Sequence, residues 1–453
     1  MIMRPANSAA PPAAASDGSP PASPARGTYA KLNRRTAVLA VGVTLSALAL
    51  NQVLGTLSIL IMYPFWFSRL KRAGRATLRL SPAMVAVFAF PVWACLSTLW
   101  SHHPEYSLRF GLEFISMLMC TVIAARIIPT EELIVGIVGA IGFVMLTTLA
   151  SGRYAQDYMT GETSLVGFVG AKNMVGLYAT MGIYFSGLLL IRVRWGGKTV
   201  LLGLLTLLLS MIALYKARSA TALVSLLAVC SIAYAMVLVG KLPKKLRKPL
   251  LIMTAVIAVV AVVAGANLGL QGDVLAALGK SSTLTGRTYL WSEGYKIGLQ
   301  EPIIGRGYFA FWVQGEPRAE RYWHEFTVLS RTGFHFHSMH VQTFVDLGLV
   351  GETLLALVLL GSFFKSLMRA ARDGADAESL FCVGVSTFFL IRSFVEVDVL
   401  GPFSCSVFLL YSVLPRLEEY RSSPVLKAAA APPPPRAPRP IRMLDAPLPF
   451  DKP

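Results

Sequence analysis

The sequence is poor in charged residues, which make up 15% of its 453 residues, whereas hydrophobic residues make up 55%. A soluble globular chain has about 25% charged residues, so this chain has too little polar surface to fold in water. Acidic residues are especially few, 24 against 42 Lys and Arg. In a membrane protein such a basic excess first marks the loops that stay in the cytoplasm. We therefore expect an all-α integral membrane protein, surrounded by membrane lipid and without a nucleic-acid partner.

Cysteine is also scarce. The five cysteines all fall within apolar runs, and none belongs to a CxxC pair. This pattern argues against both a disulfide framework and a thiolate metal site. The cysteines are Cys95, Cys120, Cys230, Cys382 and Cys405.

Long apolar runs dominate the remaining sequence. A transmembrane helix needs roughly 20 apolar residues, and on this basis the runs predict twelve spans. The segment 36–67 is long for one pass and short for two, but both of its flanks are basic. Because basic flanks stay in the cytoplasm, the chain must cross out and come back there. The predicted spans are 36–50, 52–67, 82–100, 109–127, 132–150, 173–191, 199–215, 219–240, 250–270, 341–364, 379–396 and 400–414.

The positive charges give this topology a direction. Twelve passes place both tails in the cytoplasm, and the cytoplasmic tails and loops together hold 28 of the 42 Lys and Arg. The same topology places the long polar insertion outside, in the periplasm of a diderm bacterium. The Pro-rich tails are expected to be disordered, and no cleavable signal peptide is expected, because the polar arm before the first span is long. The predicted parts are an N-terminal tail (1–35), spans 1–9 (36–270), an outer catalytic loop (271–340), spans 10–12 (341–414) and a C-terminal tail (415–453).

The outer loop 271–340 contains four of the six histidines, three of the seven tryptophans and seven basic residues. It is too aromatic for a disordered segment, so we expect a folded cap. Its segment 285–312 predicts a short amphipathic helix that starts near Thr285, then a Gly-punctuated turn. Arg287 lies in the first turn of that helix, where backbone N–H groups also attract anions. The residues predicted one turn apart are Leu290, Trp291, Tyr295 and Leu299.

Two further groups of charges lie near the outer face. Lys216 and Arg218 occupy a short turn between two apolar spans, on the side where few positive charges are expected. They either reach lipid phosphates by snorkelling or serve the function. Within a span, Arg392 precedes Glu396 and Asp398, and these three charges either neutralise one another or contribute to the site.

Three histidines stand where the outer loop re-enters the membrane, in "HFHSMHVQTFVDLGLVGE" (335–352). His335, His337 and His340 could suggest a metal site, but no Asp, Glu or Cys lies at ligand spacing nearby, and we expect no metal. A general base is the better interpretation, because neutral imidazole accepts a proton near neutral pH. The alternative is that they are interfacial histidines satisfied by their neighbours.

These segments together resemble a known family. The run "GRTYLW…EPIIGRGYFAFW…HSMHVQTFVDLGLVG" is similar to the shared domain of O-antigen ligases and Wzy-type polysaccharide polymerases, and "GFVGAKNMVGLY" (167–178) resembles their outer-loop Lys-Asn-x-x-Gly segment. The "GRGYFAFW" ending looks most like the exopolysaccharide polymerases of the ExoQ type. The resemblance covers roughly residues 150–365.

The resemblance implies a metal-independent glycosyltransferase of GT-C type in the bacterial inner membrane, without a cofactor. It would act on glycans linked to undecaprenyl diphosphate, with a glycan acceptor. By motif, the outward arginines of the family correspond to Arg218 and Arg287, and its histidine corresponds to His337. The family usually has Asn after that histidine, whereas this chain has Ser338, so His340 also stays a candidate for the base.

The expected chemistry follows from the donor. A lipid diphosphate is already activated, so an enzyme needs cations for the departing diphosphate and a base for the attacking hydroxyl. Guanidinium groups suit the first task, because their fork matches phosphate oxygens in pairs. The predicted catalytic residues are Arg218, Arg287 and His337, and the predicted substrate-binding residues are Lys216, Lys172, Asn173, His340, Trp291 and Trp312.

Three functions remain to be distinguished. A polymerase would join lipid-linked repeat units into exopolysaccharide, with a flippase and a chain-length regulator as possible partners. A ligase would move a finished glycan onto a lipid A core or a protein. A transporter would be expected to show two similar halves and charged sites at the bilayer midplane, whereas this sequence shows no similarity between its halves and few charges within its spans.

Overall fold

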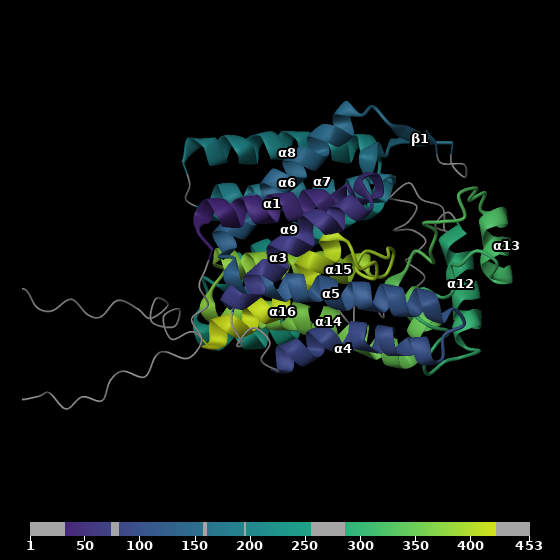
Figure 1. Ribbon diagram of the computed structural model, residues 1–453. Coiled ribbons are helices and arrows are strands. Elements are labelled where there is room, and N and C mark those ends of the chain that lie inside the picture. The colour runs from purple at the N-terminus through teal and green to yellow at the C-terminus, as the bar shows by residue number, and fades with distance from the viewer. Residues whose placement is uncertain (1–31, 74–80, 157–160, 194–195, 255–285, 423–453) are drawn as a thin grey trace, which may run out of the picture.

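The structure is a computed structural model that describes residues 32–73, 81–156, 161–193, 196–254 and 286–422. Its long helices run side by side in one bundle, and two short helices cover one end (Figure 1). The bundle helices are α1 Arg34–Ala49, α3 Thr56–Ala73, α4 Pro82–Leu96, α5 Pro104–Ile127, α6 Thr130–Ala150, α7 Lys172–Arg192, α8 Gly197–Ala217, α9 Ala220–Val239, α14 Met339–Asp373, α15 Ala377–Arg392 and α16 Cys405–Ser422. The two at the end are α12 Arg287–Gly298 and α13 Pro317–Glu325.

The described chain contains almost no β-structure. The strands β1 Tyr154–Gln156 and β2 Thr163–Leu165 form one antiparallel pair. Short helical turns occur at α2 Asn51–Leu54, η2 Ser97–Leu99 and η3 Gly167–Val169. The expectation of an all-α protein is therefore confirmed.

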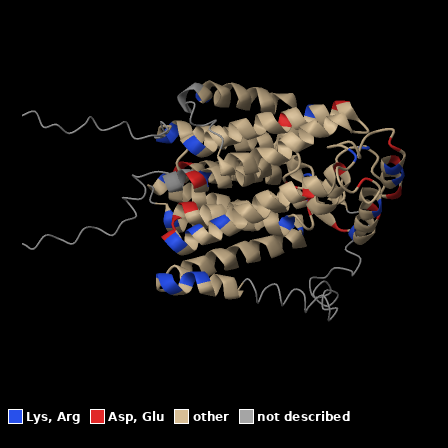
Figure 2. Ribbon diagram, turned by 90° about the horizontal axis from the view of Figure 1, so that it is seen from below, with Lys and Arg blue, Asp and Glu red and all other residues tan. Residues whose placement is uncertain are grey.

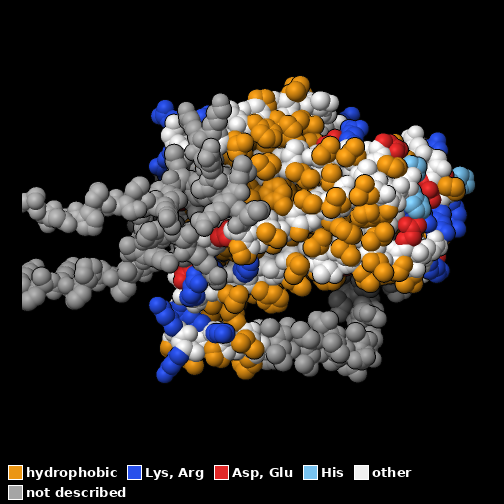
Figure 3. All heavy atoms as spheres, turned by 60° about the horizontal axis from the view of Figure 1, so that its bottom comes forward, with side chains coloured by type: hydrophobic (Ala, Val, Ile, Leu, Met, Phe, Trp, Pro, Cys, Tyr) orange, Lys and Arg blue, Asp and Glu red, His pale blue; other side chains and the backbone are white. Residues whose placement is uncertain are grey.

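Seven helices within the described ranges are long and apolar enough to cross a membrane. Figure 3 shows a belt of hydrophobic side chains across the middle of the visible face, with charged groups toward the ends. Such a belt is expected where lipid, and not water, surrounds the helices. The seven segments are Pro82–Leu99, Pro104–Ile127, Thr130–Ala150, Lys172–Arg192, Gly197–Ala217, Ala220–Val239 and Met339–Asp373.

The segment 36–67 forms a helical hairpin. The indole nitrogen of Trp66 on α3 donates a hydrogen bond of 3.0 Å to the Thr44 hydroxyl on α1, and the chain turns between the two helices at Gly55, where φ is +52°. This pairing agrees with the out-and-back path inferred from the basic flanks. The count of twelve spans stays a prediction, and most of the predicted ninth span, 250–270, lies outside the described residues.

Basic side chains gather at the end of the bundle opposite α12 and α13, whereas acidic and basic side chains mix around those two helices (Figure 2). At the basic end, Arg416 of α16 binds Glu378 of α15 at 2.8 Å, and Arg247 donates a hydrogen bond of 3.0 Å to the carbonyl of Ala371. We call this the basic end, and we call the opposite end the cap end.

α14 is broken near its start. Gly348 has φ +64° and ψ −162°, so the helix consists of a short segment before that residue and a long one after it. The expected span 341–364 therefore does not run as one straight helix. The next subsection shows what fills the break.

Candidate active site

The cap has a hydrophobic core of its own. Residues of α12, α13 and the start of α14 share it with Phe311 and Phe336. Helix α12 begins at Arg287, close to the expected start, but the predicted face is buried only in part: Leu290 is buried, whereas Tyr295 and Leu299 are 51% and 66% exposed. The residues that it buries are Leu290, Gly294, Ile297 and Gly298.

Glycine decides which face of α12 turns inward. A Cβ atom at Gly294 would lie 2.4 Å from Val341 Cγ1, and one at Gly298 would lie 2.5 Å from Phe344 Cδ1. Only glycine permits so close an approach of α12 to α14. The sequence interpretation followed the large apolar residues and therefore missed the two glycines of this face.

Arg287 is the first residue of α12, as expected from the sequence. Its guanidinium donates one hydrogen bond of 2.6 Å to the Val395 carbonyl and another of 3.1 Å to the buried Glu396 carboxylate. Gly286 precedes it with φ +82° and has no side chain to cap the helix. The cation therefore stands on the first residue of a helix whose start has no side-chain cap, and free N–H groups at a helix start suit an anion.

His335 and His337 lie beside this arginine. Their ring centroids are 4.3 Å apart, and His337 adopts a left-handed backbone conformation with φ +53°. Burial and the positive charge of Arg287 lower the pKa of His335 to about 4. Burial, His335 and Arg287 also lower the pKa of His337 well below its usual value. Both imidazoles are therefore neutral at neutral pH, the form that can accept a proton.

Trp291 and Trp312 hold the histidine segment in place. The Trp291 indole donates a hydrogen bond of 2.9 Å to the Phe336 carbonyl, and the Trp312 indole donates one of 3.0 Å to the Gln342 side chain. Both rings are half-buried at the edge of the cap core. These contacts give the two tryptophans a supporting role, and their predicted stacking on sugars stays a prediction.

His340 is held from two sides. Its Nδ1 atom lies 2.5 Å from Glu352 Oε1, and its Nε2 atom lies 3.0 Å from the Ser393 hydroxyl. Twelve residues separate His340 from Glu352, which is about 18 Å along an unbroken helix. The break at Gly348 brings the two side chains together, so the partner of His340 could not be found from helical spacing.

The segment "EPIIGRG" fills the break in α14. The amides of Leu349 and Val350, at the start of the long helical segment, donate to the carbonyls of Pro302 and Ile303. A Cβ atom at Gly348 would lie 2.4 Å from the Ile303 carbonyl, and one at Gly305 would lie 2.5 Å from the backbone of Asp346. Both glycines have positive φ. This is a physical reason for glycine in the motif, because only a bare backbone fits at these two places.

Lys216 and Arg218 are at the same end of the bundle as the cap. The Lys216 amine lies 3.1 Å from the hydroxyl of Tyr154 in β1, and β1 lies at the cap end (Figure 1). Only Arg218 and Ser219 separate α8 from α9, a shorter turn than expected. Arg218 is exposed, has φ +49° and forms no hydrogen bond or ion pair within the described part of the chain.

The Lys-Asn-x-x-Gly segment packs against this turn. Ser219 donates a hydrogen bond of 3.2 Å to Asn173, and a Cβ atom at Gly176 would lie 2.7 Å from Ala222. Lys172 is the first residue of α7. The structure thus brings Lys172, Asn173 and the Arg218 turn together, and it separately brings Arg287, His335 and His337 together at the same end.

The charges of 392–398 form two separate pairs. Arg392 forms a buried ion pair with Asp398, with distances of 2.5 and 3.0 Å, whereas Glu396 pairs with Arg287. The alternative that the three charges neutralise one another is correct only for Arg392 and Asp398. Sequence reasoning missed Glu396 as the partner of Arg287, although its place at the outer end of a span was a signal.

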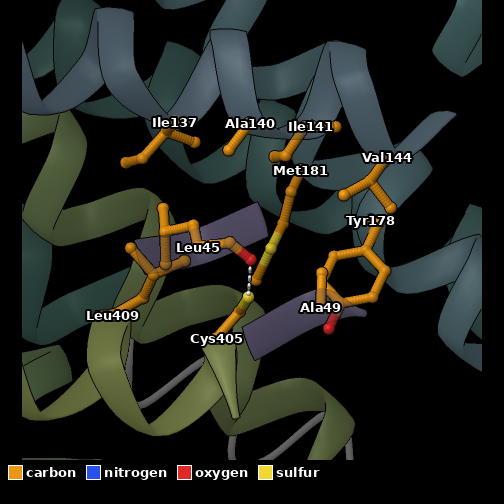
Figure 4. A pocket seen from close by; sticks show the side chains of 10 residues that line it. All are labelled: Leu45, Ala49, Ile137, Ala140, Ile141, Val144, Tyr178, Met181, Cys405 and Leu409. Atoms are coloured by element: carbon orange, nitrogen blue, oxygen red, sulfur yellow. Dashed lines mark hydrogen bonds between the residues drawn. The ribbon is translucent and has the colours of Figure 1, made fainter. Parts of the chain in front are cut away.

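Other sites are less suitable. The pocket in Figure 4 has an accessible volume of about 10 Å³, and its lining is apolar except for the Tyr178 hydroxyl and the Cys405 thiol, which donates to the Leu45 carbonyl. It has no charged group that could act on a substrate. Within the described ranges, no three His, Cys, Asp or Glu side chains are grouped as a metal ion would require.

The sequence is similar to that of a known protein and to a known domain family. The exopolysaccharide production protein ExoQ of Rhizobium meliloti is 36% identical over 378 residues, which cover 83% of this chain and 86% of that protein. The chain belongs to the ExoQ family. The sequence pattern that describes the O-antigen ligase domain also matches residues 204–357. This region contains Arg218, Arg287, His337 and His340, so the family resemblance deduced from the motifs is confirmed, and with it a multi-pass membrane protein.

Proposed function

We propose that this protein polymerises undecaprenyl-diphosphate-linked oligosaccharide repeat units into exopolysaccharide. The proposal places it in the bacterial inner membrane, with twelve spans and with the cap in the periplasm. Membership of the ExoQ family supports a polysaccharide polymerase or ligase. The observation that carries the proposal is the group formed by Arg287, His335 and His337 at the cap end.

In the proposed reaction, Arg287 and Arg218 bind the donor diphosphate through paired hydrogen bonds. His337 takes the proton of the acceptor hydroxyl, and the hydroxyl oxygen attacks the anomeric carbon. The bond from that carbon to the diphosphate oxygen breaks, and undecaprenyl diphosphate leaves with the bonding electrons. Direct displacement inverts the configuration, and the arginines stabilise the negative charge that develops on the leaving group.

The contacts of the two histidines favour His337 as the base. Both nitrogens of His340 are engaged, by Glu352 and Ser393. The His337 ring has no hydrogen bond within the described residues, and its Nδ1 atom is buried. A bound diphosphate would offset the charge of Arg287 and so raise the proton affinity of His337 when the donor is present.

The remaining predicted residues have supporting roles. Lys172 and Lys216 would add positive charge near the diphosphate, and Asn173 would position the Arg218 turn through Ser219. Trp291 and Trp312 would offer their exposed edges to sugar rings. No cofactor is needed for this reaction, and activity is expected to survive excess EDTA. A flippase and a chain-length regulator remain proposed partners.

A ligase is the second candidate, because the domain matched by residues 204–357 is described as O-antigen ligase. Deletion of the gene, followed by analysis of lipid-linked intermediates, separates the two. Accumulated single repeat units are expected for a polymerase. Accumulation of finished chains would instead identify a ligase, and an unchanged set of intermediates would contradict both.

A further inference from the structure

A second cavity lies at the basic end, far from the cap. It has a volume of about 350 Å³ and lies between the start of α4 and the ends of α14 and α16. None of the residues assigned above to the reaction lines it. It therefore requires a separate explanation.

Its lining combines positive charge with apolar surface. Three of its side chains are basic and one is acidic. Apolar side chains form the rest of the wall. The charged lining residues are Lys365, Arg369, Arg372 and Glu418, and the apolar ones are Pro82, Ala83, Met368, Leu414 and Leu417. An amphiphile with an anionic head fits such a lining, because its head can contact the basic side chains while its tail contacts the apolar ones.

The ion pairs around the cavity leave a positive excess. Arg369 and Arg372 pair with Asp376 and Asp373 at 3.2 and 2.6 Å, and Glu418 lies 3.6 Å from a buried arginine of α5. Among the lining residues and the partners described here, four groups are basic and three are acidic.

Lys365 accounts for this excess, because it is exposed and forms no ion pair within the described residues. Its stem and that of Arg372 extend from α14 into the same cavity. An anion between them would be attracted by both positive charges, and Lys365 would not have to give up an ion pair to bind it.

The position of the cavity matches a membrane surface. Arg372 follows Glu352, at the cap end, by twenty residues of the same helical segment, which is about 30 Å. The hydrocarbon core of a bilayer is also about 30 Å thick. If the site near Glu352 lies at one membrane surface, the cavity lies at the headgroups of the other.

We propose that this cavity binds one anionic membrane phospholipid. The phosphodiester lies between Lys365 and Arg372, and one acyl chain lies along Met368 and Leu417. Basic pockets between membrane helices on the cytoplasmic side are suited to acidic headgroups. The proposal concerns a lipid of the membrane itself and depends on no step of the reaction described above.

The test uses the full chain in nanodiscs that contain equal amounts of phosphatidylglycerol and phosphatidylcholine with the same acyl chains. Native mass spectrometry of the released protein counts the retained lipids. Preferential retention of one phosphatidylglycerol is expected. The double variant Lys365→Gln, Arg372→Gln should reduce this preference about 30-fold, since each cation near a membrane surface contributes about 1 kcal/mol. Lys198→Gln is the matched control, because it removes an exposed cation outside the cavity and should change nothing.

A second variant tests the apolar wall. Met368→Trp keeps every charge but fills the cavity, so it should also abolish retention of phosphatidylglycerol. Thermal unfolding in the same nanodiscs shows that each variant is folded. Equal retention of both lipids by the wild type, or wild-type selectivity in the double variant, would overturn the proposal.

Discussion

Arg287 is a half-buried cation with a buried carboxylate partner, and burial of both charges costs free energy of desolvation. Its contact with Glu396 positions the guanidinium before any substrate arrives. Replacement of Arg287 or Arg218 by Ala is expected to lower polymer formation at least about 100-fold, the usual effect of removing one group that stabilises a leaving charge. Polymer size analysis in a deletion strain measures this.

Controls for these variants exist on the same helices. Lys296→Ala on α12 removes an exposed cation that only pairs with Glu293, and Lys198→Ala lies at the other end of α8 from Arg218. Both should leave polymer formation unchanged. Full activity of Arg218→Ala or Arg287→Ala, in protein that is normally inserted, would remove that arginine from the mechanism.

The two histidines allow an equally direct comparison. His337→Ala is expected to abolish polymer, whereas His340→Ala should leave measurable activity, because His340 links Glu352 to Ser393 and has no free ring nitrogen. Single-turnover assays with a lipid-linked donor separate the two variants. The opposite ranking would mean that His340 is the base.

The lowered pKa of His335 and His337 has a consequence for pH. Each folded pKa is below the unfolded value of about 6.5. Stability from the neutral imidazoles is therefore complete above about pH 6.5 and decreases as the pH falls below it. We expect polymer formation to stay level as the pH decreases through 6.5, and His335→Gln to flatten the loss of thermal stability in acid. A decline of activity centred on pH 6.5 would show that His337 titrates normally.

At the scale of elements, the break in α14 and the "EPIIGRG" loop act as one unit. Gly348→Ala would force a left-handed backbone on alanine and push its Cβ atom into Ile303. We expect a loss of about 2–4 kcal/mol in stability and loss of activity. Gly361→Ala, in the same helix with open space around it, is the control. Thermal unfolding in detergent measures the stability of both variants. Equal stability of the two would contradict the conclusion that glycine is required at position 348.

Elements were predicted from the sequence where their pattern is local. Within the described residues each apolar run lies mainly in helix, although α14 and α16 end eight or nine residues beyond the expected spans. The basic flanks of 36–67 indicate a hairpin, and the Trp66–Thr44 contact agrees with it. The contact between His340 and Glu352 could not be predicted in this way, because it depends on the break at Gly348. On α12 the apolar Leu290 was predicted correctly, whereas the buried Gly294 and Gly298 were missed, because glycines give no hydrophobic signal.

At the scale of the whole molecule, the charge asymmetry predicts an orientation that can be measured. Leu329 in the cap is 87% exposed, so Leu329→Cys should react with a membrane-impermeant maleimide in intact cells. Lys198→Cys should react only after the membrane is opened. A Cys230→Ser background removes the exposed native thiol. The reverse pattern of labelling would place the cap in the cytoplasm.

The long segment of α14 after Gly348 begins beside His340 and ends in the basic cavity. With the proposed lipid bound, this rod would connect a headgroup at one membrane surface to His340 at the other. Under both proposals, the lipid composition of one leaflet would then influence catalysis at the opposite one.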